Sequence, residues 1–173
     1  MVVGQKRAIA GILGVLLVVA VTSEAADLGK TIASTEGRKR AAENGLKEIK
    51  SKSPQPSEQI RAAYVEAANK QNAWLDVVCQ AVEQGSTAAP DVSTAAQSAA
   101  DSLVEWVNVR NRALGLPELT GAIADSTKKS VVQDLLDIAN ETWKNNRSTD
   151  AKKRASAASS LKDRLRWRAF EEI

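Results

Sequence analysis

An unbroken apolar run of 14 residues, residues 8–21, most limits what this chain can become. Two cations, Lys6 and Arg7, precede the run, and the mostly small residues Thr22-Ser23-Glu24-Ala25-Ala26 follow it. A run with no polar face does not suit the surface helix of a bundle, which keeps one polar side toward water. The basic start, the apolar stretch and the small residues together predict a signal peptide or a signal anchor over residues 1–26.

The length of this run bears on the choice between the two. At about 1.5 Å per residue, a helix of this length spans about 21 Å, which is shorter than a hydrocarbon core of about 30 Å. The short span favours a cleaved signal peptide, whereas an uncleaved segment would act as an anchor. In both cases the basic N-terminus stays in the cytoplasm and the remaining chain crosses the membrane. We therefore expect an exported protein, periplasmic or anchored facing the periplasm, with secretion also possible.

Residues 27–56 are polar and basic, and we expect them to form a linker or a marginal helix. Gly29, Gly37 and Gly45 recur every eight residues, and glycine weakens a helix. The segment nevertheless has a coiled-coil-like alternation of spacings of four and three, although polar side chains occupy its middle positions. A proline-rich break at residues 53–57 separates it from the rest of the chain.

Residues 57–173 contain four amphipathic stretches, each with an apolar stripe at helical spacing. Loops of about four to eight residues between them should make consecutive helices antiparallel. The predicted fold is therefore all-α, an antiparallel four-helix bundle with up-down-up-down order. The expected helices cover residues 58–84, about 91–114, about 121–145 and 151–173.

Local signals mark the ends of these four helices. Ser57, Thr120 and one of residues 148–150 are candidate N-caps, because their side chains can accept a hydrogen bond from the first turn. Gly85 and Gly115 follow the first two helices. They are natural stops, since glycine readily adopts the left-handed conformation that ends many helices.

The chain contains no histidine and a single cysteine, Cys79. Histidine is the commonest general base and a common metal ligand, so the usual catalytic and metal-binding arrangements are missing. One cysteine cannot form an intramolecular disulfide or a cysteine zinc site. Cys79 belongs to an apolar stripe, so we expect a buried and unreactive thiol. The sequence predicts no enzyme activity, no metal and no cofactor.

Three of the four tryptophans, Trp74, Trp106 and Trp143, lie in or beside apolar stripes and are expected in the core. Trp167 differs. If the last helix continues to the C-terminus, Trp167 lies about 200° from Leu165 around the helix axis. Trp167 is then on the outer face.

The predicted partner-binding site consists of Arg164, Arg166, Trp167 and Phe170, which share that outer face. Exposed aromatic side chains among arginines suit a protein partner or an anionic membrane surface. The alternative is that the end of the helix frays or rotates, so that Trp167 tucks into the bundle.

Charged residues elsewhere support weaker alternatives. An acidic stripe of Asp134, Asp137 and Glu141 precedes the basic last helix, and we expect surface pairing between the two helices. The lysines and arginines of that last helix could instead neutralise the phosphates of a nucleic acid or another polyanion. The mild net charge of +3 and the export signal argue against nucleic acid as the partner.

Two resemblances are short. Tyr64 and the triplet Asn72-Ala73-Trp74 resemble the LemA family of helical bundles behind an N-terminal membrane segment, but residues 75–82 depart from that family's pattern. No function is carried over. The layout of a membrane segment before charged helices also resembles phage inner-membrane spanins, although the chain's four prolines interrupt their long coiled coil.

The sequence thus favours a non-catalytic exported helical-bundle protein of the bacterial envelope. It would bind a protein or an anionic surface through its C-terminal basic-aromatic helix. One alternative is a membrane-anchored phage lysis protein or another membrane-active protein. A second alternative is a protein that binds an anionic polymer or nucleic acid.

Overall fold

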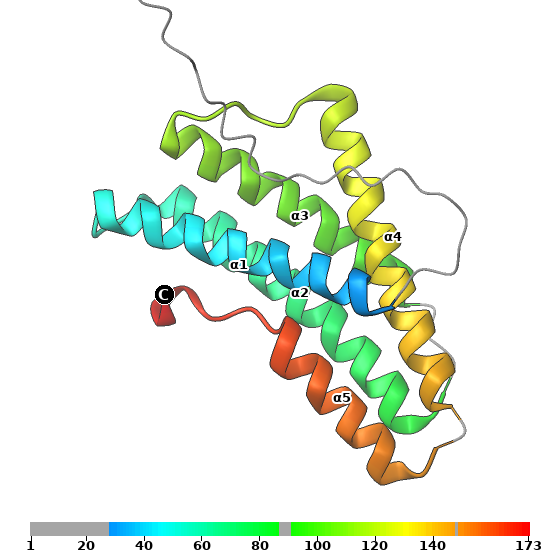
Figure 1. Ribbon diagram of the computed structural model, residues 1–173. Coiled ribbons are helices and arrows are strands. Elements are labelled where there is room, and N and C mark those ends of the chain that lie inside the picture. Colours follow the sequence, from blue (N-terminus) through cyan, green and yellow to red (C-terminus); the bar gives the residue numbers. More distant parts are fainter. Residues whose placement is uncertain (1–27, 87–90, 148) are drawn as a thin grey trace, which may run out of the picture.

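The computed structural model describes residues 28–86, 91–147 and 149–173. These residues form five α-helices and one short 3-10 turn, with no β-strand among them (Figure 1). The all-α class is confirmed, but the predicted number of four helices is wrong, because a further helix packs with the bundle. The elements are α1 (Leu28–Lys52), α2 (Glu58–Gln84), α3 (Asp91–Leu114), α4 (Gly121–Asn146), α5 (Ala151–Leu165) and η1 (Phe170–Glu172).

The signal peptide or anchor predicted over residues 1–26 lies outside the described residues. The loop at residues 87–90 and the candidate cap Ser148 lie outside them as well. Among the helices that the structure describes, none combines the length and the apolar character needed to cross a membrane.

α1 is the helix that the sequence did not assign to the bundle. Of the two alternatives for residues 27–56, the linker is wrong for Leu28–Lys52, which forms a 25-residue helix. Leu46 and Ile49 are buried in the common core, and Thr35 is buried on the same side. α1 packs against α3, α4 and α5. Its stability therefore comes from tertiary packing rather than from intrinsic helix propensity.

Gly45 lets a side chain of α3 lie across α1. A Cβ atom at this position would stand 2.4 Å from Cδ of Arg110, which is too close. The guanidinium of Arg110 donates from Nε to Oδ1 of Asn111 at 3.0 Å. Asn111 in turn donates to the carbonyl oxygen of Pro117 at 2.6 Å. A glycine therefore suits position 45, because the side chain of Arg110 passes too close to leave room for a Cβ atom.

α2 runs through the middle of the bundle, and its predicted ends are confirmed. The Oγ of Ser57 accepts a hydrogen bond from the N–H of Ile60 at 3.4 Å. Gly85 ends the helix with φ of 65°, the left-handed conformation expected of a glycine stop. Cap and stop are local signals, so the sequence alone placed both.

The expected core residues of α2 and α3 are also confirmed. Trp74 and Trp106 are buried, while Trp143 of α4 is partly buried. The Sγ of Cys79 lies 3.5 Å from the carbonyl oxygen of Ala158, under α5. Burial raises the pKa of the Cys79 thiol to about 11, so the reactive thiolate is scarce at neutral pH.

A short turn joins α3 to α4. Gly115 has φ of 69°, and the N–H of Leu116 donates back to the carbonyl oxygen of Asn111 at 2.7 Å. Thr120 occupies the position before α4, but its side chain makes no capping hydrogen bond. Thr120 is therefore the N-cap residue, as predicted, but the side-chain hydrogen bond expected of it is not formed.

The two halves of α4 differ in burial. Residues 121–130 include no buried residue, and Ile123 is 64% exposed. In Figure 1 these first turns stand clear of α1 and α2. The second half packs into the core. Its buried residues are Val131, Leu135, Ile138, Ala139 and Thr142.

α5 begins after Asp150, whose Oδ1 accepts a hydrogen bond from the N–H of Lys153 at 2.9 Å. The helix ends at Leu165. The prediction that it continues to the C-terminus is therefore wrong. At Arg166 the backbone is extended, with φ of −66° and ψ of 126°. We call residues 166–173 the C-terminal segment, which runs back beside α1 in Figure 1.

Candidate functional site: the docked C-terminal segment

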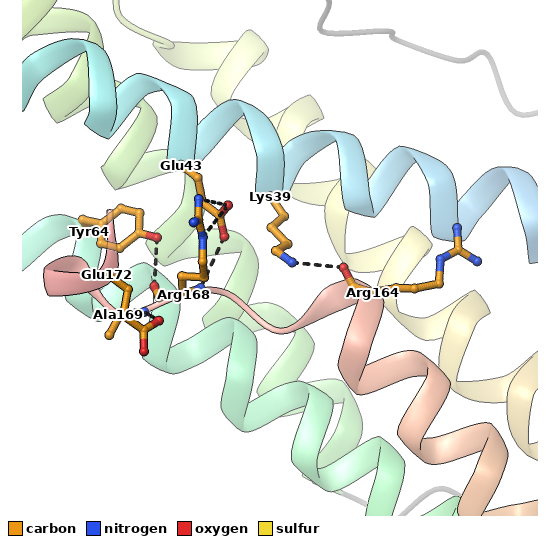
Figure 2. A network of polar contacts seen from close by, with 7 residues as sticks. All are labelled: Lys39, Glu43, Tyr64, Arg164, Arg168, Ala169 and Glu172. Carbon is orange, nitrogen blue, oxygen red and sulfur yellow. Dashed lines mark hydrogen bonds and ion pairs between the residues drawn. The ribbon is translucent and has the colours of Figure 1, made fainter. Parts of the chain in front are cut away.

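The C-terminal segment lies between α1 and α2 and is bonded to side chains of both helices (Figure 2). Most of these bonds go to its main chain, so they hold a path of backbone and not only a set of side chains. We give the name docking face to five side chains, of which four bond to the main chain of the segment and one, Lys39, bonds to the carbonyl oxygen of Arg164 in the last turn of α5. They are Lys39, Glu43 and Lys50 of α1, and Tyr64 and Asn72 of α2.

Asn72 and Tyr64 fix the middle of the path. The Oδ1 of Asn72 accepts a hydrogen bond from the N–H of Trp167 at 2.9 Å, and its Nδ2 donates to the carbonyl oxygen of Trp167 at 3.2 Å. The hydroxyl of Tyr64 donates to the carbonyl oxygen of Arg168 at 3.0 Å. These three main-chain groups of Trp167 and Arg168, which have no helical partner, are thus satisfied by side chains of α2.

Two lysines of α1 hold the ends of the path. The Nζ of Lys39 donates to the carbonyl oxygen of Arg164 at 3.2 Å, in the last turn of α5. The Nζ of Lys50 donates to the carbonyl oxygen of Phe170 at 2.6 Å. A cation at the C-terminal end of a helix also opposes the negative pole of the helix dipole, which adds to the bond of Lys39.

Glu43 binds Arg168 through both of its oxygens. Oε1 accepts the main-chain N–H of Arg168 at 3.3 Å, while Oε2 accepts its guanidinium from Nε at 3.2 Å and from Nη2 at 3.1 Å. Glu43 is 6% exposed, so its charge is largely removed from water. A buried carboxylate is tolerated when a cation and hydrogen bonds satisfy it. Arg168 supplies both.

The aromatic side chains of the segment pack around Tyr64. Trp167 is 5% exposed, and its ring centroid lies 5.8 Å from that of Tyr64. Phe170 is 8% exposed, with its centroid 6.2 Å from Tyr64. Tyr64 also meets Trp106 edge-on at 5.2 Å. The Nζ of Lys50 lies 4.2 Å above the Phe170 ring, a cation–π contact.

The predicted exposure of Trp167 and Phe170 is therefore wrong. The outer-face position of Trp167 assumed a helix that continues to the C-terminus, and α5 stops at Leu165. The alternative left open by the sequence, that Trp167 tucks into the bundle, is what the structure shows. The structure brings the two predicted aromatic residues together, but in the core and not on a surface.

The two predicted arginines lie outside the aromatic cluster and carry carboxylate partners. The Nη2 of Arg164 lies 3.0 Å from Oε2 of Glu36, and Arg166 pairs with Asp76. Hydrogen bonds from Arg164 and Arg40 hold the pKa of Glu36 below its ordinary value. These pairs remain partly exposed to solvent, so each contributes little to stability.

The pairing expected between the acidic stripe and the last helix is not found among the ion pairs of the described residues. Asp134 pairs with Arg38 of α1, at 2.7 Å from Nη2 to Oδ2. Glu141 pairs within α4, with Lys144 at 3.6 Å. The cations of the C-terminal region instead face acids of α1 and α2. The reason is that the C-terminal segment turns away from α4 and lies between those two helices.

Burial changes the acid-base behaviour of Tyr64. Its pKa is raised well above the ordinary range, first because burial disfavours the phenolate and then because Glu43 adds a negative charge nearby. Tyr64 therefore keeps its proton at physiological pH. It remains a hydrogen-bond donor to the carbonyl oxygen of Arg168.

One sequence signal could have revealed the extended path. From Arg164 to Ala169 the side chains alternate strictly between basic and apolar. A period of two is typical of extended backbone, in which successive side chains point to opposite sides. The structure follows this alternation at residues 165–168, where Leu165 and Trp167 are buried and the two arginines beside them are exposed.

Other chemistry is not assembled in the part of the chain that the structure describes. No group of three or more Cys, Asp or Glu side chains there is placed to hold a metal ion. One surface hollow, lined by Ser57, Ile60 and Arg112 among others, has a volume of about 190 Å³. Pockets for small ligands usually have volumes of about 300–1,000 Å³. The docked C-terminal segment therefore remains the best candidate for a functional site.

Comparison of the chain with known proteins finds no matching protein family, no matching curated protein and no matching solved structure. The short resemblance to the LemA family therefore gains no support from the comparison of families. A function for this chain has to be derived from the contacts of the C-terminal segment.

Proposed function

We propose that this chain is a non-catalytic, exported helical-bundle protein of the bacterial envelope that binds a protein partner at the docking face. In this proposal, an extended segment of the partner takes the place of the C-terminal segment. One observation carries it. Five side chains from two helices bond to main-chain groups of residues 164–170.

Main-chain recognition distinguishes this contact from ordinary packing between helices. Apolar side chains alone could hold a tail against a bundle. Proteins that recognise extended peptides instead use bonds to the peptide main chain for affinity and side-chain pockets for specificity. The docking face makes such main-chain bonds, and the side chains of Trp167 and Phe170 are buried beside it. Because its main-chain bonds do not depend on residue identity, an extended segment from another protein can form them too.

The protein's own segment acts as a competitor. It is tethered through α5, so its effective concentration at the docking face is on the order of millimolar. A partner must bind more tightly or be locally concentrated to replace it. Replacement would expose Trp167 and Phe170, beside the already exposed Arg166. These belong to the basic-aromatic set that the sequence predicts to face a partner.

An anionic membrane or polymer fits the same region less well. Arg164, Arg166 and Arg168 each pair with a carboxylate of α1 or α2. A phosphate would have to replace a carboxylate at every one of these positions. A protein segment, in contrast, can reproduce the ion pair and the main-chain bonds together.

The test uses a full-length release variant, Trp167→Ala, whose own segment is weakened. A fluorescein-labelled synthetic peptide of residues 164–173 is titrated with this variant, and fluorescence anisotropy is measured. We expect saturable binding to the release variant. Binding to the wild-type chain should be at least about tenfold weaker, because the tethered segment occupies the docking face.

A matched control adds Asn72→Leu to the release variant, which removes both bonds to the residue 167 main chain. We expect peptide affinity to fall at least about tenfold. A melting curve first shows that each variant is folded, and Phe170→Ala replaces Trp167→Ala if it is not. A folded release variant without saturable binding, or with binding unchanged by Asn72→Leu, overturns the proposal.

Export is tested separately by the intact mass of the protein isolated from the envelope of its host. Loss of residues up to about Ala25 would indicate a cleaved signal peptide, and their retention in a membrane fraction would indicate an anchor. Recovery of the full-length chain from the cytoplasm would contradict export.

A further inference from the structure

We infer that the partner segment carries an arginine between two aromatic side chains, in the order aromatic–Arg–any–aromatic, and that Glu43 selects this arginine. The inference rests on the proposed function and specifies the chemistry of the partner. It follows from what each position of the C-terminal segment contacts, taken one position at a time.

The arginine is the first determinant. Glu43 is buried, and its described ion pair is with Arg168. Removal of the C-terminal segment takes this cation away and also uncovers Glu43 to water. Any segment that covers Glu43 again buries the carboxylate, and a buried carboxylate without a cation is costly. A partner that brings a cation to the same place restores the pair, whereas a neutral side chain leaves Glu43 unpaired.

The geometry favours arginine over lysine. One oxygen of Glu43 is occupied by the main-chain N–H of Arg168, so the other must accept the side-chain donors. Arg168 directs two nitrogens, Nε and Nη2, at that single oxygen. A lysine offers one compact ammonium group and lacks the planar fork of donors that arginine presents.

Aromatic side chains on either side of the arginine are the second determinant. Trp167 lies one residue before Arg168, and Phe170 lies two residues after it. Both rings pack on Tyr64 from different positions. Cations stand over the Phe170 ring, from Lys50 at 4.2 Å and Arg61 at 5.2 Å. An aliphatic side chain fills space there but has no ring face to attract these cations.

The main-chain bonds exclude proline from one position of the partner segment. The N–H groups of Trp167 and Arg168 both donate to the docking face. Proline has no N–H group, so it cannot occupy the position of Trp167 without losing a bond to Asn72. The partner segment must therefore be extended and free of proline where it passes Asn72.

The residues after the second aromatic are weak determinants. Glu171 pairs with Arg61, but both side chains are about half exposed. Exposed ion pairs contribute little because water and salt screen them. An acidic residue at this position should improve affinity only slightly, so it does not belong to the recognition pattern.

The occupant is another protein and not a second copy of this chain. The tail of a second copy makes the same contacts as the tethered segment and gains nothing over it. The tethered segment also has the higher effective concentration. A partner that carries the pattern with additional contacts outside it can displace the segment.

The experiment is a double-mutant cycle in the full-length release variant. Labelled peptides of residues 164–173 carry the natural sequence, the substitution Arg168→Gln, or the substitution Phe170→Leu. Each is titrated against the release variant and against the same variant with Glu43→Gln. We expect Arg168→Gln to weaken binding about 30-fold when Glu43 is present and less than about threefold when it is Gln. Phe170→Leu should weaken binding about fivefold on both proteins.

The outcomes separate this inference from the proposed function. Binding of the natural peptide with equal binding of the substituted peptides overturns the recognition pattern but leaves the proposed function standing. No binding of the natural peptide to a folded release variant overturns both. Light scattering of the wild-type chain at about 100 µM should report a monomer, and a dimer that Arg168→Gln abolishes would identify a second copy as the occupant and overturn the inference.

Discussion

The C-terminal segment and the first half of α4 reverse the usual relation between regular structure and firm packing. Residues 121–130 form a regular helix, yet none of them is buried. Residues 166–170 belong to no α-helix, and only Phe170 enters the short 3-10 turn η1, yet two of the five are large aromatic side chains in the core. The helix satisfies its main chain within itself, whereas the segment relies on side chains of two other helices.

The difference separates two kinds of stability. A helix without a buried face is held by its own hydrogen bonds, which are marginal for short stretches in water. An extended segment without such bonds is held only by tertiary contacts, and it is lost as a unit when they fail. Substitutions in the two regions should therefore have very different effects on the free energy of unfolding.

The largest difference in unfolding free energy is expected between the two halves of α4. Leu135 is 0% exposed, so Leu135→Asp would bury an unpaired charge and should cost at least about 4 kcal/mol of unfolding free energy. Ile123→Asp, on the exposed half, should change it by less than about 0.5 kcal/mol. Urea denaturation of both variants measures the difference. A Leu135→Asp protein that unfolds like the wild type would contradict the packing of α4.

Trp167→Ala should have the next largest effect. Removal of a buried tryptophan costs about 3 kcal/mol, through lost apolar burial and the cavity that remains. Ile123→Ala provides the comparison and should be nearly neutral. If Trp167→Ala is neutral as well, the C-terminal segment is not docked in solution.

Asn72→Leu tests the main-chain bonds without changing the apolar cluster. The N–H and carbonyl groups of Trp167 both lose their partner, which should cost about 2 kcal/mol. Gln133→Leu is the control, because Gln133 is exposed and its amide bonds to Asp137 of the same helix. Equal melting temperatures for the two variants would mean that the bonds to Trp167 add nothing.

Alkaline pH should lower the free energy of unfolding through Tyr64. The folded chain keeps the Tyr64 proton above pH 10, because its pKa is raised, while the unfolded chain loses it near pH 10. Stability from this group is therefore fully present below about pH 9 and falls as the pH rises further. The slope is at most about 1.4 kcal/mol per pH unit, so about 1 kcal/mol should be lost by pH 11.

Tyr64→Phe should remove this part of the pH dependence, measured by urea denaturation between pH 8 and pH 11. Cys79 contributes in the same direction, because its pKa is also raised. Both proteins should therefore carry Cys79→Ala. An unchanged slope in the Tyr64→Phe variant would show that the phenol is not buried.

The smallest effect is expected at the surface of the segment. Arg166→Gln removes an ion pair with Asp76 whose side chains are both about half exposed. It should cost less than about 0.5 kcal/mol, and less still in high salt. A loss above about 1 kcal/mol would mean that exposed pairs help to hold the segment.

The features that could be predicted from the sequence are those set by residues close together in the chain. The cap at Ser57 and the stop at Gly85 bound α2 as predicted, because each acts through hydrogen bonds within one turn of the helix end. The burial of Trp74 and Trp106 also followed from helical spacing. These features do not depend on what the rest of the chain does.

The end of α5 and the packing of α1 could not be predicted, because both depend on contacts with residues far away in the sequence. The end of α5 has no glycine or proline stop, and the helix gives way at Arg166 while Asn72 and Tyr64 take over the main-chain bonds of the residues that follow. The assignment of α1 failed for a similar reason. Its Gly45 reads as a helix weakener until the side chain of Arg110 is seen to pass over it.

The burial of Cys79 determines how the folded chain responds to an oxidising solution. Only the thiolate attacks a disulfide, and with a pKa of about 11 roughly one molecule in a thousand carries it at pH 8. The folded chain should therefore exchange with disulfides much more slowly than an exposed cysteine does. A covalent dimer linked through Cys79 would form only after α5 has separated from α2, so its appearance over time records how often the bundle opens.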